Sequence, residues 1–203
     1  MNHMKACFFL LICITLLSGC NTENTTSKVK ETKKVKNEEN FNKVSEVKEP
    51  EKPFNFKIEE FAKSYNKTAL AFKNAEEEVN IRQIKIDEIG DFEQTEIASG
   101  QIYTKELLNE IDDPDGTFSL QAWHDHDKNF YRLHILTTGS ENIASEQGAL
   151  HTIAVLKTLD VDIKLLNDFL DSEKDSLNVI DGDYSVQFTK IPGMSLILNI
   201  EPK

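Results

Sequence analysis

Apolar residues recur first at helical spacing and then at strand spacing as the chain leaves its lysine- and glutamate-rich N-terminal part. Residues 54–74 carry apolar side chains every three or four positions, which predicts an amphipathic helix. Residues 79–86 alternate between apolar and polar side chains with one change of phase, which predicts a strand with a bulge. A further strand is expected within residues 98–108, before an acidic turn at residues 112–116.

The clearest alternation flanks a polar segment, residues 125–129, and predicts a β-hairpin of residues 117–124 and 130–138. The register of this hairpin places His134 opposite Gln121 on one face. The apolar residues of the two strands are expected on the other face, with Phe118, Leu120 and Ala122 facing Tyr131, Leu133 and Ile135.

Helical spacing returns after Gly139, and Thr138 with Glu141, or Ser140, is expected to supply the N-terminal cap. Apolar residues then occur nearly all round the helix, which predicts that it is buried: Ala149, Leu150, Ile153, Ala154, Val155, Leu156 and Leu159. A shorter helix is expected over residues 162–172.

A turn at Asp181-Gly182 precedes a closing hairpin of residues 184–191 and 194–200, joined at Pro192-Gly193. Strands grouped apart from helices are typical of an α+β domain. We therefore expect an antiparallel sheet of about five to six strands, with the N-terminal helix and one or two later helices packed on it.

The N-terminus carries another pattern, an apolar run over residues 6–17 that is interrupted by Thr15 and preceded by Lys5. A transmembrane helix needs about 20 apolar residues, whereas the apolar part of a secretory signal peptide needs about 7 to 15. The run is of the shorter kind and ends in Leu17-Ser18-Gly19-Cys20. This motif resembles the lipobox of bacterial lipoproteins, a leucine three residues before the cysteine with two small residues between them.

The resemblance implies that residues 1–19 are a lipoprotein signal peptide and that a peptidase cuts between Gly19 and Cys20. It also implies that Cys20 receives a diacylglyceryl thioether and becomes the mature N-terminus. Two acyl chains, palmitate or similar, anchor firmly where one chain is marginal. We therefore expect a protein anchored by lipid in the cell membrane of the bacterial envelope, facing the extracytoplasmic side.

Residues 20–53 are expected to form a disordered tether behind this lipid-anchored cysteine, because they hold too few apolar residues to build a core. Eight lysines and seven glutamates nearly cancel in charge there. A flexible chain of this length spans roughly 30 Å. Residues 54–203 are then expected to form one folded domain held off the membrane by a spacer.

That domain is strongly acidic. The chain has 23 basic and 35 acidic residues. Lys5 and the tether hold nine of the basic residues, and the tether holds seven of the acidic ones. The domain therefore has 14 basic and 28 acidic residues, a net charge of −14. Such a field repels nucleic acid and favours cationic partners or divalent ions. We expect no nucleic-acid partner.

Cysteine use limits the chemistry of the mature chain. Cys7 and Cys13 lie in the expected signal peptide, and the resemblance to a lipobox implies that Cys20 carries the lipid. No cysteine then remains for a disulfide, a structural zinc site or a nucleophile. The domain is expected to depend on an ordinary hydrophobic core and to need no cofactor besides the covalent lipid.

The densest group of metal-ligand residues is His124-Asp125-His126-Asp127. Residues two apart in a strand share a face, so His124 and His126 are candidate ligands of one divalent cation. The alternative is a solvated hairpin tip, because aspartate, lysine and asparagine are typical of turns. The acidic turns at residues 112–116 and 181–183 lack the spacing of an EF-hand calcium loop.

Sequence motifs of common enzymes are absent, including the nucleophile elbow, the His-Glu-x-x-His zinc motif and phosphate-binding glycine loops. His151 lies on the apolar helix and is expected to be a core histidine with satisfied hydrogen bonds. Trp123, with Phe130 and Tyr131, is a candidate aromatic patch for a protein or glycan partner, and the alternative for Trp123 is a packing role.

These patterns favour a lipoprotein with a non-catalytic binding domain, in an accessory, immunity or surface-exclusion role, with a protein or another envelope component as partner. The alternative is a lipoprotein that binds or senses a small ligand or a divalent cation. A hydrolase would need a pocket that converges on His124 or His151 with carboxylates beside it.

Overall fold

The computed structural model describes residues 52–75, 81–98, 100–112, 115–139 and 144–203, all of which belong to one compact unit. In chain order the elements are α1 (Ile58–Ala75), the 3-10 helix η1 (Ile86–Glu88), β1 (Glu93–Ile97), β2 (Gly100–Asp112), β3 (Gly116–His124), β4 (Phe130–Gly139), α2 (Glu146–Thr158), α3 (Ile163–Leu170), β5 (Ser176–Asp181), β6 (Tyr184–Ile191) and β7 (Ser195–Pro202). The residues expected to form the signal peptide and nearly all of those expected to form the tether lie outside the described residues.

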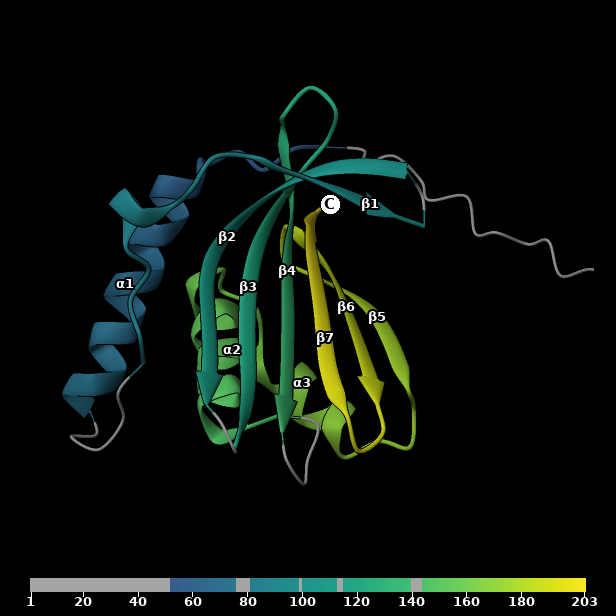
Figure 1. The fold of residues 1–203 in the computed structure, drawn as a ribbon. Helices are drawn as coiled ribbons and strands as arrows, with labels where there is room; N and C mark the ends of the chain where they lie inside the picture. The colour runs from purple at the N-terminus through teal and green to yellow at the C-terminus, as the bar shows by residue number, and fades with distance from the viewer. Residues whose placement is uncertain (1–51, 76–80, 99, 113–114, 140–143) are drawn as a thin grey trace, which may run out of the picture. The chain divides into compact units, whose positions relative to one another are not determined.

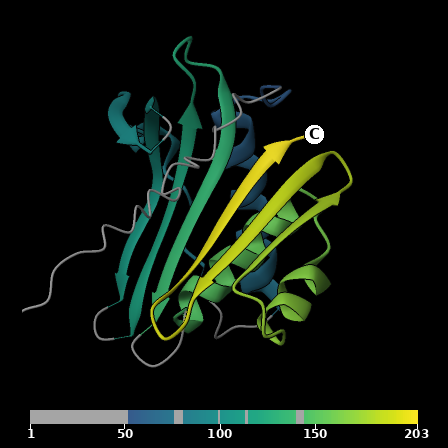
Figure 2. The same ribbon diagram turned by 90° about the vertical axis from the view of Figure 1, so that its right-hand side faces the viewer.

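The strands form one antiparallel sheet in the order β1-β2-β3-β4-β7-β6-β5. Helices α2 and α3 lie along one face of the sheet, and α1 lies beyond the edge of β2, where it contacts α2 (Figures 1 and 2). The predicted α+β fold with an antiparallel sheet is confirmed. The sheet has seven strands, where about five to six were expected.

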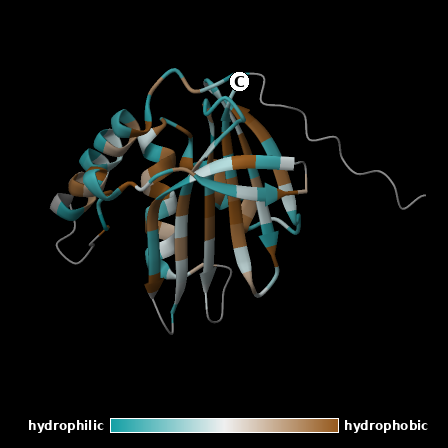
Figure 3. Ribbon diagram, turned by 45° about the horizontal axis from the view of Figure 1, so that its top comes forward, coloured by the Kyte–Doolittle hydropathy of each residue, from teal (hydrophilic) through white to brown (hydrophobic). Residues whose placement is uncertain are grey.

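The core fills the space between the sheet and the helices. Strand β3 alternates between buried and half-buried residues along its length, as expected for a strand with one face in a core. Hydrophobic residues therefore dominate the middle of the sheet, while α1 carries both kinds of residue (Figure 3). The largest fully buried side chains are Tyr65, Ile84, Phe118, Leu120, Leu133, Ile135, Leu156, Phe169, Phe188, Leu196, Leu198 and Ile200.

The central hairpin and the later helices match their predictions. Gln121 of β3 pairs with His134 of β4, the predicted register, and a bulge follows at Trp123 and His124. The predicted cap of α2 is wrong: the Ser145 hydroxyl accepts the bond from the Gly148 amide at 3.0 Å. Thr138 lies in β4 instead, because its side chain bonds across the hairpin to the backbone amide and hydroxyl of Thr117.

The predicted strand at residues 79–86 is wrong in its described part, because residues 81–85 pair with no strand. Ile81 and Ile84 are buried, but a side chain replaces the strand partner. The Asn66 amide of α1 donates to the Ile84 carbonyl at 2.8 Å and accepts from the Ile84 amide at 2.7 Å. One asparagine thus satisfies both backbone groups.

Strands β1 and β5 were not predicted. Both lie at the edges of the sheet, and their residues are half-buried or exposed. Strand β1 lacks the apolar alternation by which strands are found in a sequence, and in β5 it is limited to Leu177 and Val179. No helix among the described residues has the length and hydrophobicity that a bilayer crossing requires.

Candidate binding groove

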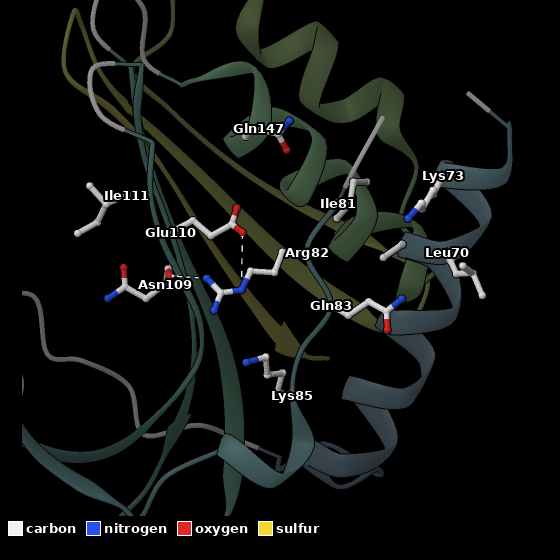
Figure 4. Close-up of a pocket in the computed structure, with 11 residues that line it drawn as sticks. Leu70, Lys73, Ile81, Arg82, Gln83, Lys85, Asn109, Glu110, Ile111 and Gln147 are labelled. Carbon is white, nitrogen blue, oxygen red and sulfur yellow. Dashed lines mark hydrogen bonds and ion pairs between the residues drawn. The ribbon is translucent and has the colours of Figure 1, made fainter. Parts of the chain in front are cut away.

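An open groove of about 830 Å³ lies between α1 and β2, with the connecting residues 81–85 along it (Figure 4). Its lining combines three cations, one carboxylate, three amides and four apolar residues. The lining residues are Lys73, Arg82 and Lys85, then Glu110, then Gln83, Asn109 and Gln147, and finally Ala69, Leu70, Ile81 and Ile111.

The segment of residues 81–85, which connects α1 to η1, contributes two of the cations that line the groove. Ile84 is tied to Asn66 and, like Ile81, is buried, which leaves Arg82 and Lys85 on the exposed side. The Arg82 guanidinium reaches β2 with its Nη1 at 3.4 Å from the Asn109 carbonyl and its Nε at 3.9 Å from Glu110 Oε1. Lys85 pairs with Glu88 at 2.8 Å on the surface.

Strand β2 has a free edge along this groove. Strand β1 pairs only with residues 100–104, whereas β3 continues along β2 to Asp112. Among the described residues, no strand lies on the other side of residues 105–112. A residue of an antiparallel strand directs its N–H and its C=O to the same side. Since the Asn109 carbonyl meets Arg82 there, we infer that its amide also faces the groove.

A chain of three polar side chains lies beneath the groove and joins three elements. Glu110 of β2 contacts His151 of α2, with Oε2 2.7 Å from Nε2. His151 Nδ1 lies 2.6 Å from the Tyr65 hydroxyl of α1. The His151 ring also stacks on Phe118, with ring centroids 4.5 Å apart. His151 and Tyr65 are fully buried, and the side chain of Glu110 is 22% exposed.

One neutral tautomer of His151 makes both hydrogen bonds that link Tyr65, His151 and Glu110. Its Nε2–H donates to Glu110, and its Nδ1 accepts from the Tyr65 hydroxyl. Burial lowers the pKa of His151, although the charge and the hydrogen bond of Glu110 oppose this. Burial raises the pKa of Tyr65, and the charge of Glu110 adds to the rise. Both groups are therefore uncharged at neutral pH, as predicted for a core histidine with satisfied hydrogen bonds.

The order carboxylate, imidazole, hydroxyl is also that of a hydrolase triad, but here the hydroxyl is at the buried end. A substrate in the groove would meet Glu110, not Tyr65. What the chain can do is hold the Glu110 carboxylate in one orientation and tie α1 and α2 to β2.

The structure places the two candidate metal ligands in different surroundings. His124 is 3% exposed, with its ring 4.9 Å from that of Phe92 and 5.5 Å from that of Phe130. The side chain of His126 is 77% exposed and lies 3.2 Å from Asp127. Strand β3 ends at His124, so the two-residue alternation that was to bring both imidazoles to one face does not extend to His126. No cluster of three or more metal-ligating side chains occurs in the part of the chain that the structure describes.

The hairpin tip is instead a turn organised by Asp125. Its carboxylate accepts from the amides of Asp127 and Asn129 and from the Asn129 side chain, at 2.8–3.0 Å. Partial burial acts to raise the pKa of Asp125, but these hydrogen bonds together outweigh it and lower the pKa below its usual value. The aspartate therefore has a structural role in the turn.

The predicted aromatic patch is divided between the two faces of the hairpin. Phe130 and Tyr131 are 8% and 5% exposed, and the ring of Phe130 packs 4.5 Å from that of Phe54. An exposed patch of all three residues is therefore wrong. Trp123 is half-buried on the face away from the helices, where Arg132 lies 4.9 Å and His134 4.6 Å from its ring.

Sequence analysis missed the groove and the partners of His151. One indication was available: Glu110 follows Leu108 by two residues in a strand, and it therefore faces the core. Cys20, the expected lipid attachment site, lies outside the described residues. No protein-family model, no curated protein and no solved structure matches this chain.

Proposed function

We propose that this protein is a lipid-anchored lipoprotein of the extracytoplasmic membrane surface, and that its acidic domain binds another macromolecule without catalysis. The observation that carries the proposal is the groove between α1 and β2, which is bordered by an unpaired strand edge. Protein partners favour surfaces where exposed apolar residues lie among polar ones, and Leu70 and Ile111 are 47% and 76% exposed here.

A binding role without catalysis is supported by the state of the polar chain. Its hydroxyl and imidazole are buried and hydrogen-bonded to each other, so neither offers a nucleophile or a base to a ligand. Glu110 is the member within reach, and His151 already bonds one of its oxygens. Such a carboxylate is suited to orienting a partner.

The lipobox supports the anchored location. Cys20 would hold the domain on the membrane, and the tether would allow it to meet partners in the envelope, in an accessory, immunity or surface-exclusion role. A Cys20→Ala variant is expected to leave the membrane fraction or to remain as an unprocessed precursor. Retention of a processed Cys20→Ala variant in the membrane fraction would contradict the anchor.

Photo-crosslinking in the producing cells tests the binding role. A photoreactive residue is placed at Leu70 or at Gln83, which line the groove, and at Glu173, an exposed control position after α3. We expect light-dependent adducts of defined mass from the two groove positions and none from the control. No adduct, or the same adducts from all three positions, would overturn the proposal.

Binding of a divalent cation is the second candidate, favoured by the exposed pair of His126 and Asp127. Calorimetry of the full mature protein with zinc, calcium and manganese separates it from the first. Micromolar binding of one ion that is lost in His126→Ala would favour this second function. His126 is the informative position, because a change at the buried His124 would also disturb the core.

A further inference from the structure

On the side away from β3, residues 105–112 of β2 pair with no strand among the described residues. Proteins limit pairing at such edges with short strands, prolines, bulges, inward-pointing charges or a covering segment. Strand β2 has two of these, a bulge between Glu106 and Leu108 and the inward-facing Glu110, and Arg82 bonds to its Asn109 carbonyl. Strand β2 has 13 residues and no proline, and β1 covers only residues 100–104 of it. Beyond them, the groove separates the edge from α1 (Figure 4). An extended segment of another chain can pair with such an edge through main-chain hydrogen bonds.

The charge of the groove indicates what kind of segment fits. Although the domain carries a net charge of −14, three cations gather here from α1 and the connecting segment: Lys73, Arg82 and Lys85. Glu110 is the one carboxylate among the lining residues and is already bonded to His151, while Lys85 is paired with Glu88 beside the groove. Complementary charges select partners and speed their encounter. An acidic segment would therefore be favoured at this edge and repelled by much of the remaining surface.

The apolar residues of the groove complement this pattern. Leu70 and Ile111 are two of the exposed large hydrophobic residues of the described chain, and both line the groove. Side chains of an added strand alternate between its two faces. A segment that alternates acidic and apolar residues could thus place one set against the cations and the other against Leu70 or Ile111.

We propose that the groove binds an extended, acidic segment of a partner protein, which adds as a strand to residues 105–112 of β2. This deepens the proposed binding function and rests on it. A second copy of this chain is a poorer occupant, because it would bring the same cations to the same edge and a domain of the same negative charge. The chain's own tether is also less suited, because its lysines and glutamates nearly cancel.

Fluorescence anisotropy of short peptides with the full mature protein tests the inference. The probe is a labelled peptide that alternates glutamate and valine. Its length of about six residues is typical of a strand. One matched peptide carries N-methyl groups on alternate backbone nitrogens and so cannot form the edge hydrogen bonds on that side. A second matched peptide has lysine in place of glutamate. Two such methylated peptides are made, one with N-methyl groups on the odd-numbered residues and one with them on the even-numbered residues.

We expect the acidic peptide to bind, and both the lysine peptide and one methylated register to lose affinity by about tenfold or more, since each loses hydrogen bonds or charge pairs. Arg82→Gln should weaken binding of the acidic peptide. Lys164→Gln removes the same charge from the exposed surface of α3 and should leave binding of this peptide unchanged. Equal binding of all the peptides, equal effects of the two variants, or no binding of the acidic peptide would overturn strand addition.

Failure of this inference differs from failure of the proposed function. Groove-specific crosslinks from Leu70 or Gln83 without binding of the acidic peptide would leave the binding role standing and remove strand addition. Absence of crosslinks together with absence of peptide binding would remove both.

Discussion

Two histidines are buried on the same side of the sheet, and they differ in what surrounds their nitrogens. His151 has a hydrogen-bond partner at each ring nitrogen, Tyr65 and Glu110. His124 packs among aromatic rings, and its Nδ1 has no hydrogen-bond partner among the described residues. Burial lowers the pKa of both imidazoles. The His151 region is thus a connected polar chain, whereas His124 acts mainly as a packing residue.

The difference has a consequence for the groove. Tyr65, His151 and Glu110 come from α1, α2 and β2, so their hydrogen bonds join the helix on one wall of the groove to the strand on the other. His124 lies at the other end of the β2–β3 pair, opposite Tyr103, and its ring contacts are with Phe92 and Phe130, which do not line the groove. Substitutions of Tyr65, His151 or Glu110 should therefore change both the stability of the protein and the geometry of the groove. A substitution of His124 should change the stability alone.

The largest effect is expected from His151→Leu. The substitution keeps a buried side chain of similar size but leaves the Tyr65 hydroxyl with only a long contact, 3.4 Å, to the Arg82 carbonyl. We expect the free energy of unfolding to fall by about 3 kcal/mol, because two buried hydrogen bonds are lost and one polar group keeps no good partner. Urea denaturation measures this, with His124→Leu as the matched control. An equal loss in the two variants would contradict the distinction.

Tyr65→Phe sharpens the comparison with a smaller change. The variant removes one hydroxyl and leaves the Nδ1 of His151 as a buried acceptor without a partner, the condition already found at His124. We expect a loss of about 1–2 kcal/mol in the same measurement. Tyr131→Phe is the control, since no hydrogen bond to that hydroxyl is found among the described residues. Tyr131→Phe should be close to neutral, and a loss as large as that of Tyr65→Phe would show that the hydrogen bond to His151 contributes little.

Parts of this picture could be predicted from the sequence because they depend on local order. Alternation on both sides of a polar turn located the β3–β4 hairpin and its register, and helical spacing located α2 and α3. The edge strands β1 and β5 were not predicted, because β1 carries no apolar alternation and that of β5 is limited to Leu177 and Val179. Residues 81–86 did alternate, but Asn66 took the place of a strand partner, and no local pattern reveals that.

The site was less predictable than the fold. A buried role for His151 followed from its apolar helix, but its partners lie 41 and 86 residues away in sequence, at Glu110 and Tyr65. The groove depends on where β1 stops pairing with β2, which is a property of tertiary packing. The argument that placed His124 and His126 on one face extended strand alternation past His124, where β3 ends.

The smallest effect is expected from His124→Phe, and it concerns pH. A histidine whose pKa is lowered by folding binds protons more readily in the unfolded state, so its contribution to stability is complete above pH 6.5, the ordinary pKa of histidine, and is lost as the pH falls below it. Burial lowers the pKa of His124, His134 and His151, and stability should therefore decline on acidification through this range.

Phenylalanine at position 124 removes one of these groups and also the nitrogen that has no partner. At pH 7 we expect His124→Phe to change the free energy of unfolding by less than about 1 kcal/mol, because the ring packs among aromatic side chains and the removed Nδ1 has no partner among the described residues. Below pH 6.5 its stability should decline less steeply than that of the unaltered protein, because one fewer imidazole takes up a proton on unfolding. Urea denaturation at several pH values measures both. Parallel declines would show that His124 is protonated as easily in the folded protein as in the unfolded chain, and that burial among Phe92 and Phe130 does not exclude the charge.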